Sequence, residues 1–337
     1  MQRRIPTLKL AAYVSGLLGV SLLTVLVVRS DFAVMWRTLR SAGLDLLWLV
    51  PNRLVYFLLY ALGWRSLLRP YDPQRRAGLG FLLWVTTVRE AIDRLLPVAS
   101  VGGGFAGVRL VGWRCIPTAP AAATVATEVL LTMFALYVMS ATGLFLLAEV
   151  GASEQTYRHV LIALVLALPV PVVSALLLRS GAVFGRLEAF LRPMVGITAL
   201  SDGAAALDRE LRACLSRGGS LAFAGVMQLA AFFWGSFEVW FALRLFGHPI
   251  DAGGAVMVEG LTQAMRHIAF MVPAGLGVQE AGFVLFGHVL GISSELALAV
   301  SMAKRMREIL CGVPSLVSWQ LWEAARLRVS LRSTRQT

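Results

Sequence analysis

The sequence predicts an all-α integral membrane protein in which about six full transmembrane helices and two broken, re-entrant helical hairpins form an inverted repeat. Three observations predict this fold. The 337 residues are 58% hydrophobic and only 15% charged, whereas about 25% of the residues in a soluble domain are charged. Several apolar runs exceed the roughly 18 residues that mark a spanning helix. Two further apolar runs are interrupted by Pro and Gly. Such residues make the backbone irregular, and irregular backbone does not occur where it would face lipid.

Six apolar stretches are predicted to cross the membrane. The first follows a basic segment, but it is long for the apolar core of a signal peptide and no small-residue cleavage pattern follows it. We therefore interpret it as a retained helix. The six predicted spans are Leu8–Val28, Leu44–Leu62, Ala119–Ala148, Val160–Leu178, Leu221–Phe246 and Glu295–Trp322.

The side of the membrane on which each connection lies follows from its Lys and Arg content, because cytoplasmic connections are rich in both. Connections 149–158 and 247–253 are poor in basic residues and are expected outside. One segment fits this assignment least well, because its basic residues are placed on the outer side of the membrane: Arg29, Arg37 and Arg40. Four basic segments are expected in the cytoplasm: the N-terminus, the loop with Arg65, Arg69, Arg75 and Arg76, the connection from Arg179 to Arg217, and the C-terminal tail.

This assignment fixes the direction of the two interrupted runs. The run Leu79–Val111, broken at 97–104, must enter and return on the cytoplasmic side, and Gly254–Leu290, broken at 273–277, must do so on the outer side. The chain 1–337 is then one membrane domain with two oppositely oriented halves, 1–150 and 155–325. Paired Gly/Pro interruptions of this kind point to a transporter's binding site. Both breaks are therefore expected to line a central cavity.

The approach to the first break, "TTVREAIDRLLP", carries opposite charges four residues apart. Arg89 with Asp93, and Glu90 with Arg94, are expected to be adjacent on a helix. Charges in the membrane cost less when they are paired or face protein or water. Two interpretations stay open: a polar wall of the cavity, or a self-neutralised patch near the cytoplasmic surface.

A second polar group surrounds the second break. Its first members share one helical face, two more follow the break, and the last span carries "AKRMRE", in which Lys304 and Glu308 are expected to pair. Intramembrane ionisable residues are candidates for function. Glu128 and Glu238, single carboxylates within spans, are either functional or packed. The candidates at the second break are Glu259, Gln263, Arg266, His267, Gln279, Glu280, Lys304, Arg305, Arg307 and Glu308.

Other classes of site are not indicated. The four His and three Cys residues have no metal-ligand spacing, the glycines at 102–104 lack a Walker lysine, and no dinucleotide motif is present. We expect no metal, no cofactor and no catalytic residue. The net charge of +12 lies largely beside apolar runs, where it sets topology and meets anionic lipid, so nucleic acid is not an expected partner. The segment "SDGAAALDRELRACL" predicts an amphipathic helix at the cytoplasmic interface.

The segments "FMVPAGLGVQEAGFVLFG" and "SMAKRMREILCGVPSLVSW" resemble the transmembrane region of lysylphosphatidylglycerol synthases, a flippase-like family. With "LLPVASVGG", the resemblance is closest to the hopanoid-biosynthesis-associated (HpnL-like) branch and covers nearly the whole chain. It implies that Pro273, Gly275, Gly277 and Glu280 form the family's second motif, and that Arg305, Arg307 and Glu308 are its final-span charges. Related sequences tend to have an acidic residue where this one has Gly104.

In the bifunctional multiple peptide resistance factors, a related domain flips aminoacylated phosphatidylglycerol, and a separate soluble domain makes that lipid. The resemblance implies only the translocating part here. The leading hypothesis is a bacterial inner-membrane flippase for an anionic or hopanoid-related lipid, with both termini in the cytoplasm. Arginine suits such a head group because it grips phosphate bidentately. The alternative is a non-catalytic scaffold for lipid-biosynthetic enzymes. An embedded transferase is disfavoured, since no nucleophile–base or metal constellation appears, and the oligomeric state is left open.

Overall fold

The computed structural model describes residues 37, 39–96, 102–150, 154–167, 173, 176, 200–269, 272 and 275–334. The predicted span Leu8–Val28, most of the second half of Val160–Leu178, positions 97–101 of the first break, and Pro273 lie outside these residues. Throughout the described ranges the chain is helical and contains no strand. The elements are η1 (Gly43–Trp48), α3 (Leu49–Leu68), η2 (Arg69–Tyr71), α4 (Leu79–Leu95), α5 (Gly102–Gly112), α6 (Thr118–Glu149), α7 (Glu154–Ala167), α10 (Leu200–Ser216), α11 (Gly218–Leu245), α12 (Ala252–Ile268), α13 (Val278–Val289) and α14 (Ser294–Thr334).

Three of the described helical segments are long and apolar enough to cross a membrane, namely Leu39–Tyr71, Thr118–Glu149 and Gly218–Leu245. They coincide with three of the six predicted spans. The predicted span Glu295–Trp322 forms the first part of α14, a helix of 41 residues. This helix carries Lys304, Arg305, Arg307 and Glu308 in its interior, and it is not among the three.

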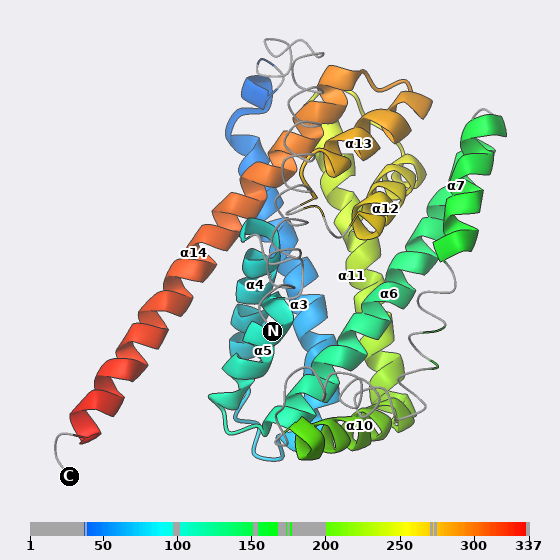
Figure 1. Cartoon of the computed structure of the whole chain (residues 1–337). Helices are drawn as coiled ribbons and strands as arrows, with labels where there is room; N and C mark the ends of the chain where they lie inside the picture. Colours follow the sequence, from blue (N-terminus) through cyan, green and yellow to red (C-terminus); the bar gives the residue numbers. More distant parts are fainter. Residues whose placement is uncertain are drawn as a thin grey trace, which may run out of the picture.

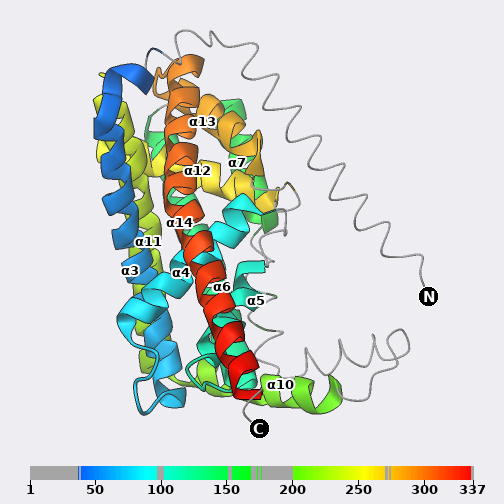
Figure 2. The same cartoon turned by 90° about the vertical axis from the view of Figure 1, so that its left-hand side faces the viewer.

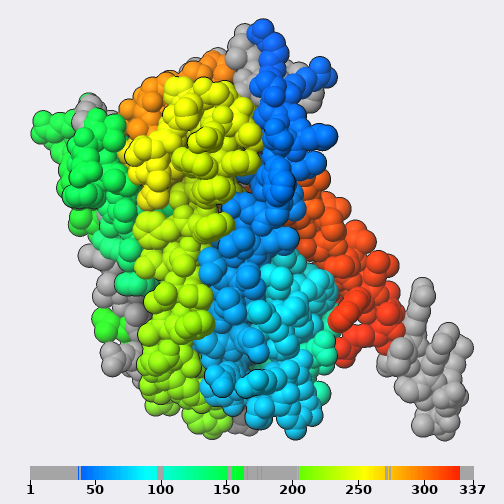
Figure 3. Space-filling model, turned by 180° about the vertical axis from the view of Figure 1, so that it is seen from behind, coloured from blue at the N-terminus to red at the C-terminus, as the bar shows by residue number. Residues whose placement is uncertain are grey.

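The two interrupted runs each form a pair of helices, α4 with α5 and α12 with α13, whose members pack against each other. In Figure 1 the loops that join α3 to α4 and α5 to α6 lie at the lower end of the molecule, whereas α12 and α13 gather at the upper end. α3 and α11 run side by side over the height of the molecule (Figures 2 and 3), while the lower part of α14 projects from the body (Figure 1). The amphipathic segment forms α10, as predicted, and packs against α6.

Each helix pair has its own apolar core, because apolar surface is stabilised when it leaves water or replaces loose lipid contacts with close packing. The first core includes Trp64, Leu82 and Leu110 from α3, α4 and α5. The second includes Met257 and Phe283 from α12 and α13, together with residues of α6 and α11. Large apolar side chains on the outside, such as Phe134 and Phe145 of α6, are 57% and 63% exposed, as expected for a surface that faces lipid.

Small residues let α6 and α12 approach closely, which is how helices pack where lipid surrounds them. A Cβ atom at Gly260 would lie 2.9 Å from the carbonyl oxygen of Met139. The Ser140 hydroxyl lies 3.4 Å from the Gly260 carbonyl oxygen, which accepts its hydrogen bond. The backbones of these two helices therefore touch, and α12 is held against the bundle by a long helix of the other half of the chain.

Three tryptophans from α4, the end of α5 and α14 form one aromatic group. The ring of Trp322 lies 5.1 Å from that of Trp84 and 6.3 Å from that of Trp113. The guanidinium of Arg326 stacks on Trp113, 4.6 Å from the ring centre. Tryptophan and arginine side chains together are typical of the boundary between membrane and water.

Candidate functional site

A group of charged side chains lies inside the helical body, where α3, α4, α11, α12, α13 and α14 meet. Most of its members are less than 10% exposed. They are linked to one another by ion pairs and hydrogen bonds, and we refer to them as the charged network. It consists of the five carboxylates Glu90, Glu238, Glu259, Glu280 and Glu308 and the six cations Arg53, Arg94, Arg266, Lys304, Arg305 and Arg307.

Glu280 closes the second break. One of its carboxylate oxygens accepts a hydrogen bond from the backbone N–H of Gly277 at 2.8 Å, which caps the first turn of α13. The other accepts from the Ser301 hydroxyl at 3.0 Å and from Arg305 Nε at 2.8 Å. Gly277 has a φ of 76°, which glycine adopts at little cost. The carboxylate, fully buried, therefore joins the break to α14.

The break is also held from the side of α12. Arg266 Nη1 donates to Gln279 Oε1 at 2.7 Å, and Gln279 donates onward to Ser301 at 2.8 Å. Arg266 also lies 3.9 Å from Glu308 of α14. Gly275 is needed here, because its φ is 60° and a Cβ atom would lie 2.8 Å from Arg266 Nε. The described backbone of the break has polar partners within the protein, since the Gly277 N–H donates to Glu280 and the Gly275 carbonyl oxygen accepts from Arg305 at 3.4 Å, as membrane-buried breaks require.

Glu238 lies at the centre of the network, 1% exposed. Arg307 Nε is 3.3 Å from one of its oxygens, Lys304 Nζ is 3.7 Å from the other, and Arg53 is 4.0 Å away. Neither oxygen accepts a hydrogen bond in this conformation. Lys304 instead makes its short contact, 2.6 Å, with Glu259. Glu238 thus forms ion pairs with three cations, none of which donates a hydrogen bond to it.

The first half of the chain enters the network through α3 and α4. Arg53 Nη2 donates to Glu90 at 2.5 Å, and Arg94 Nε lies 3.3 Å from the same carboxylate. The predicted Glu90–Arg94 pair is therefore confirmed. Arg53 also stacks on the ring of Tyr56, 3.6 Å from its centre. Charges near the two breaks, distant in sequence, thus belong to one continuous network.

Two ion pairs predicted from spacing are wrong. Asp93 does not pair with Arg89, because it accepts a hydrogen bond from the backbone N–H of Gly103 at 2.9 Å and so caps α5. Arg89 instead binds Glu128 at 2.6 Å and stacks over Trp64. The carboxylate that contacts the start of α5 thus comes from the preceding helix, α4.

The other wrong pair is Lys304 with Glu308. Lys304 pairs with Glu259 and Glu238, and Glu308 lies 3.8–3.9 Å from Arg266, Arg305 and Arg307. Lys304 takes its partners from α12 and α11, whereas Glu308 is shared between Arg266 of α12 and two arginines of its own helix. Lys304 and Glu308 therefore take part in the packing of α14 against α11 and α12.

Two predicted residues lie at the edge of the site. Gln263 donates to Glu259 at 2.9 Å. His267 has a ring nitrogen 2.8 Å from the Gln263 carbonyl oxygen, and its side chain is exposed rather than part of the network. Arg53 and Ser301 were not predicted as site residues from the sequence. Arg53 carried a usable signal, since it is a lone arginine inside the predicted span Leu44–Leu62.

At the network, the described residues leave much less space than the open cavity that the sequence predicted. The pocket between α4 and α14, lined by Glu90, Arg94, Arg307 and Glu308, has a volume of only about 10 Å³, which barely admits one water molecule. The charged side chains close on one another instead. Among the described residues, no group of three His, Cys, Asp or Glu side chains is arranged to hold a metal ion.

Comparison of the sequence with protein families identifies one match. The family described as the transmembrane region of lysylphosphatidylglycerol synthase matches residues 13–313. The chain belongs to that family. Membership in the lysylphosphatidylglycerol synthase transmembrane-region family indicates a membrane protein of lipid metabolism, and the match contains every member of the charged network. Searches of curated proteins and of solved structures give no significant match.

Proposed function

We propose that this protein is a flippase, which moves an anionic or hopanoid-related lipid across the bacterial inner membrane between its two broken helical hairpins. One observation carries the proposal: eleven charged groups are gathered around a backbone break in the interior of an apolar helical bundle. Burying ion pairs gives little net stability compared with apolar packing. Membrane-embedded charges of this kind are typical of substrate and ion pathways.

The inverted repeat is part of this proposal. α6 begins at Thr118 and α14 at Ser294, 176 positions later. Cys115 and Gly291, again 176 apart, both have positive φ, 63° and 72°. The pairs of packed helices follow the same relation, since α6 packs on α12 as α14 packs on α4. These correspondences support an inverted repeat, in which the two halves have the same order of helices and their hairpins enter the membrane from opposite sides.

The charges suggest the class of lipid. The network has six cations and five carboxylates, so it keeps a positive excess when all are ionised. Arginine binds phosphate or carboxylate bidentately. The closed pocket implies that a head group enters only after α14 separates from α4.

The direct test is a leaflet-resolved assay in reconstituted vesicles. Fluorescent phosphatidylglycerol in the inner leaflet becomes accessible to an impermeant quencher only after it is flipped. We expect protein-containing vesicles to expose it faster than empty ones. A scaffold for lipid-biosynthetic enzymes, the alternative function, would leave the rate at that of empty vesicles.

The proposed orientation can be measured with two thiols, one native and one introduced. Cys115 is exposed between α5 and α6, at the end that we assign to the cytoplasm. Glu154, exposed at the start of α7, is assigned to the outside. In spheroplasts of a Glu154→Cys variant, an impermeant maleimide should label the introduced thiol at once and Cys115 only after lysis. The reverse order would contradict the proposed topology.

We also propose that the protein is not an enzyme. The charged residues of the network are engaged with one another, and the sequence has no Walker lysine or metal-ligand motif. Purified protein should neither hydrolyse ATP nor transfer an aminoacyl group to phosphatidylglycerol. ATP turnover that persists through repurification would contradict this expectation.

A further inference from the structure

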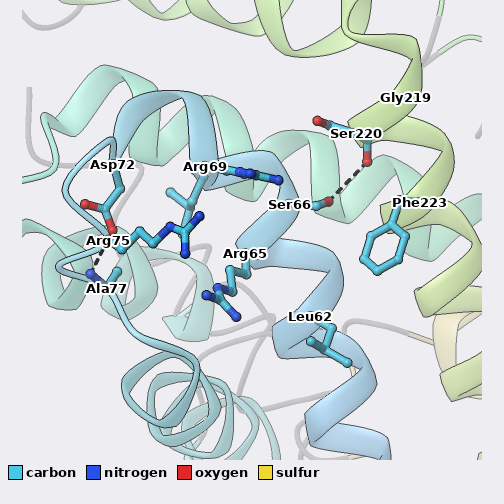
Figure 4. Close-up of a pocket in the computed structure, with 11 residues that line it drawn as sticks. Leu62, Arg65, Ser66, Arg69, Asp72, Arg75, Ala77, Gly219, Ser220 and Phe223 are labelled. Carbon is cyan, nitrogen blue, oxygen red and sulfur yellow. Dashed lines mark hydrogen bonds between the residues drawn. The ribbon is translucent and has the colours of Figure 1, made fainter.

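A second polar site lies about 12 residues along α3 from Arg53, at the end where α3 stops and α11 begins, roughly 18 Å away at 1.5 Å per residue. It is a pocket of about 470 Å³. Figure 4 shows that two parts of the chain line it, the end of α3 with the loop after it and the start of α11. The side chains of Arg65 and Arg69 belong to α3 and η2, and Arg75 comes from the following loop. Phe223 and the backbone at Gly219 and Ser220 come from α11.

The pocket has an excess of positive charge, since three arginines and one carboxylate line it. None of the three arginines makes a side-chain hydrogen bond or ion pair with another residue in the described part of the chain. The carboxylate in the pocket, Asp72, is already bound, because it accepts from the backbone N–H groups of Arg76 at 2.9 Å and Ala77 at 2.8 Å. Arg75 has a φ of 53°, which non-glycine residues seldom adopt. The turn around Asp72 holds it there.

The start of α11 adds to the positive electrostatic potential of the pocket. Its N-cap residue, Arg217, makes no side-chain capping bond, and the first backbone N–H groups of a helix have no partner within the helix. Gly219 and Ser220, two of these residues, line the pocket. Helix N-termini favour anions through their free N–H groups and the helix dipole. Three arginines and a helix start therefore converge on one space.

One wall of the pocket is apolar and leads onto the outer face of α11. Leu62 and Phe223 line it, and Phe223 is 45% exposed. Val226, one turn further along α11, is 59% exposed. A ligand that fits both parts has a phosphate and an adjoining hydrocarbon chain. We propose that this pocket binds the phosphate of an anionic phospholipid whose acyl chains lie along α11.

The arginines are not a requirement of helix packing. The positions 176 residues after Arg65, Arg69 and Arg75 are Phe241, Leu245 and Asp251. Phe241 and Leu245 pack against an apolar cluster at the opposite end of the bundle. The same places in the second half thus hold apolar or acidic side chains. The site belongs to one end only, so the lipid would be bound from one leaflet.

The test is calorimetric titration of the full-length protein in a non-ionic detergent with short-chain phosphatidylglycerol, phosphatidylcholine of equal chain length, and inorganic phosphate. We expect phosphatidylglycerol to bind saturably and at least about tenfold more tightly than the other two. Arg65→Gln/Arg69→Gln should weaken its binding about tenfold or more, as loss of charge-assisted hydrogen bonds does. Binding needs no translocation, so this result is independent of the proposed flippase activity.

The matched control is Arg209→Gln/Arg212→Gln, which removes two exposed charges from α10 at the same end of the molecule. It should bind like the wild type. Equal binding of phosphatidylglycerol by the Arg65/Arg69 variant would overturn the proposal, as would equal affinity for phosphatidylcholine. If inorganic phosphate bound as tightly as phosphatidylglycerol, the pocket would be a site for a soluble anion instead. If the Gln variant does not fold, Arg65→Lys/Arg69→Lys is the test. This variant keeps the positive charge but loses the bidentate geometry of arginine. It should bind phosphatidylglycerol several-fold more weakly than the wild type.

Discussion

Glu280→Gln is expected to reduce lipid translocation at least about tenfold while leaving the protein folded in the membrane. The amide keeps the size of the side chain and can still accept the hydrogen bond from Gly277. It loses the charge that holds Arg305, whose Nε lies 2.8 Å from the carboxylate. Charge-assisted bonds are about twice as strong as neutral ones. Arg305, already 3.8 Å from Glu308, would then turn to that carboxylate. The second break would lose its charged link to α14 and keep only neutral hydrogen bonds such as that from Gln279 to Ser301.

The measurement is the vesicle assay described above, with thermal unfolding of each variant followed in parallel. Glu149→Gln is the control, since Glu149 is exposed at the end of α6 and should leave the rate unchanged. A wild-type rate for Glu280→Gln would mean that its charge has no part in transport. If that variant does not fold, Arg305→Gln, which keeps the cap of α13 intact, should show the same loss of rate.

Lys304→Met should cause the largest loss of stability of any single change in the network. Lys304 lies 2.6 Å from Glu259 and 3.7 Å from Glu238, and both carboxylates are at most 3% exposed. Removing one partner of a buried ion pair costs about 3–5 kcal/mol, because the remaining charge is uncompensated. Thermal unfolding in detergent should show a fall in Tm well beyond that of Arg209→Gln, an exposed control.

A second substitution identifies the cause. In Lys304→Met/Glu259→Gln, the carboxylate closest to the missing ammonium is neutral, so part of the lost stability should return. If the double variant is as unstable as Lys304→Met, the cost comes from altered packing rather than from charge. If Lys304→Met unfolds like the wild type, the short contact with Glu259 does not stabilise the fold.

Most of the described helices lie where the sequence predicted them, but α14 continues to Thr334, past the predicted end at Trp322, and α7 begins at Glu154, before the predicted start at Val160. The interrupted run Leu79–Val111 forms two helices, α4 and α5, with the break between them. The predicted span Ala119–Ala148 corresponds to α6. Such boundaries are predictable because they depend on local composition: apolar length, and the places where Gly and Pro interrupt it. The membrane assignment follows from the same composition, and family membership agrees with it.

The partners of the charges could not be predicted in the same way. Spacing along one helix correctly predicted Glu90 with Arg94, whose Nε lies 3.3 Å from the carboxylate. It failed for Arg89 and Lys304, which bind Glu128 and Glu259 on other helices. A buried charge takes the nearest opposite charge in three dimensions, and the sequence contains that information only through the tertiary fold. Arg53 could have been found as a lone arginine inside a predicted span, but not its carboxylate partners, which lie on α4 and α11.

The charges on α14 have a consequence for the biogenesis of the protein. A lone Lys or Arg at the centre of a helix costs about 2.5–3.5 kcal/mol on insertion, so a helix with Lys304, Arg305 and Arg307 would not leave the translocon by itself. Their partners Glu238, Glu259 and Glu280 all precede α14 in the chain and are synthesised first. Helices α11 to α13 would therefore wait near the translocon with unpaired carboxylates, and integration of all four helices would be completed together when α14 emerges.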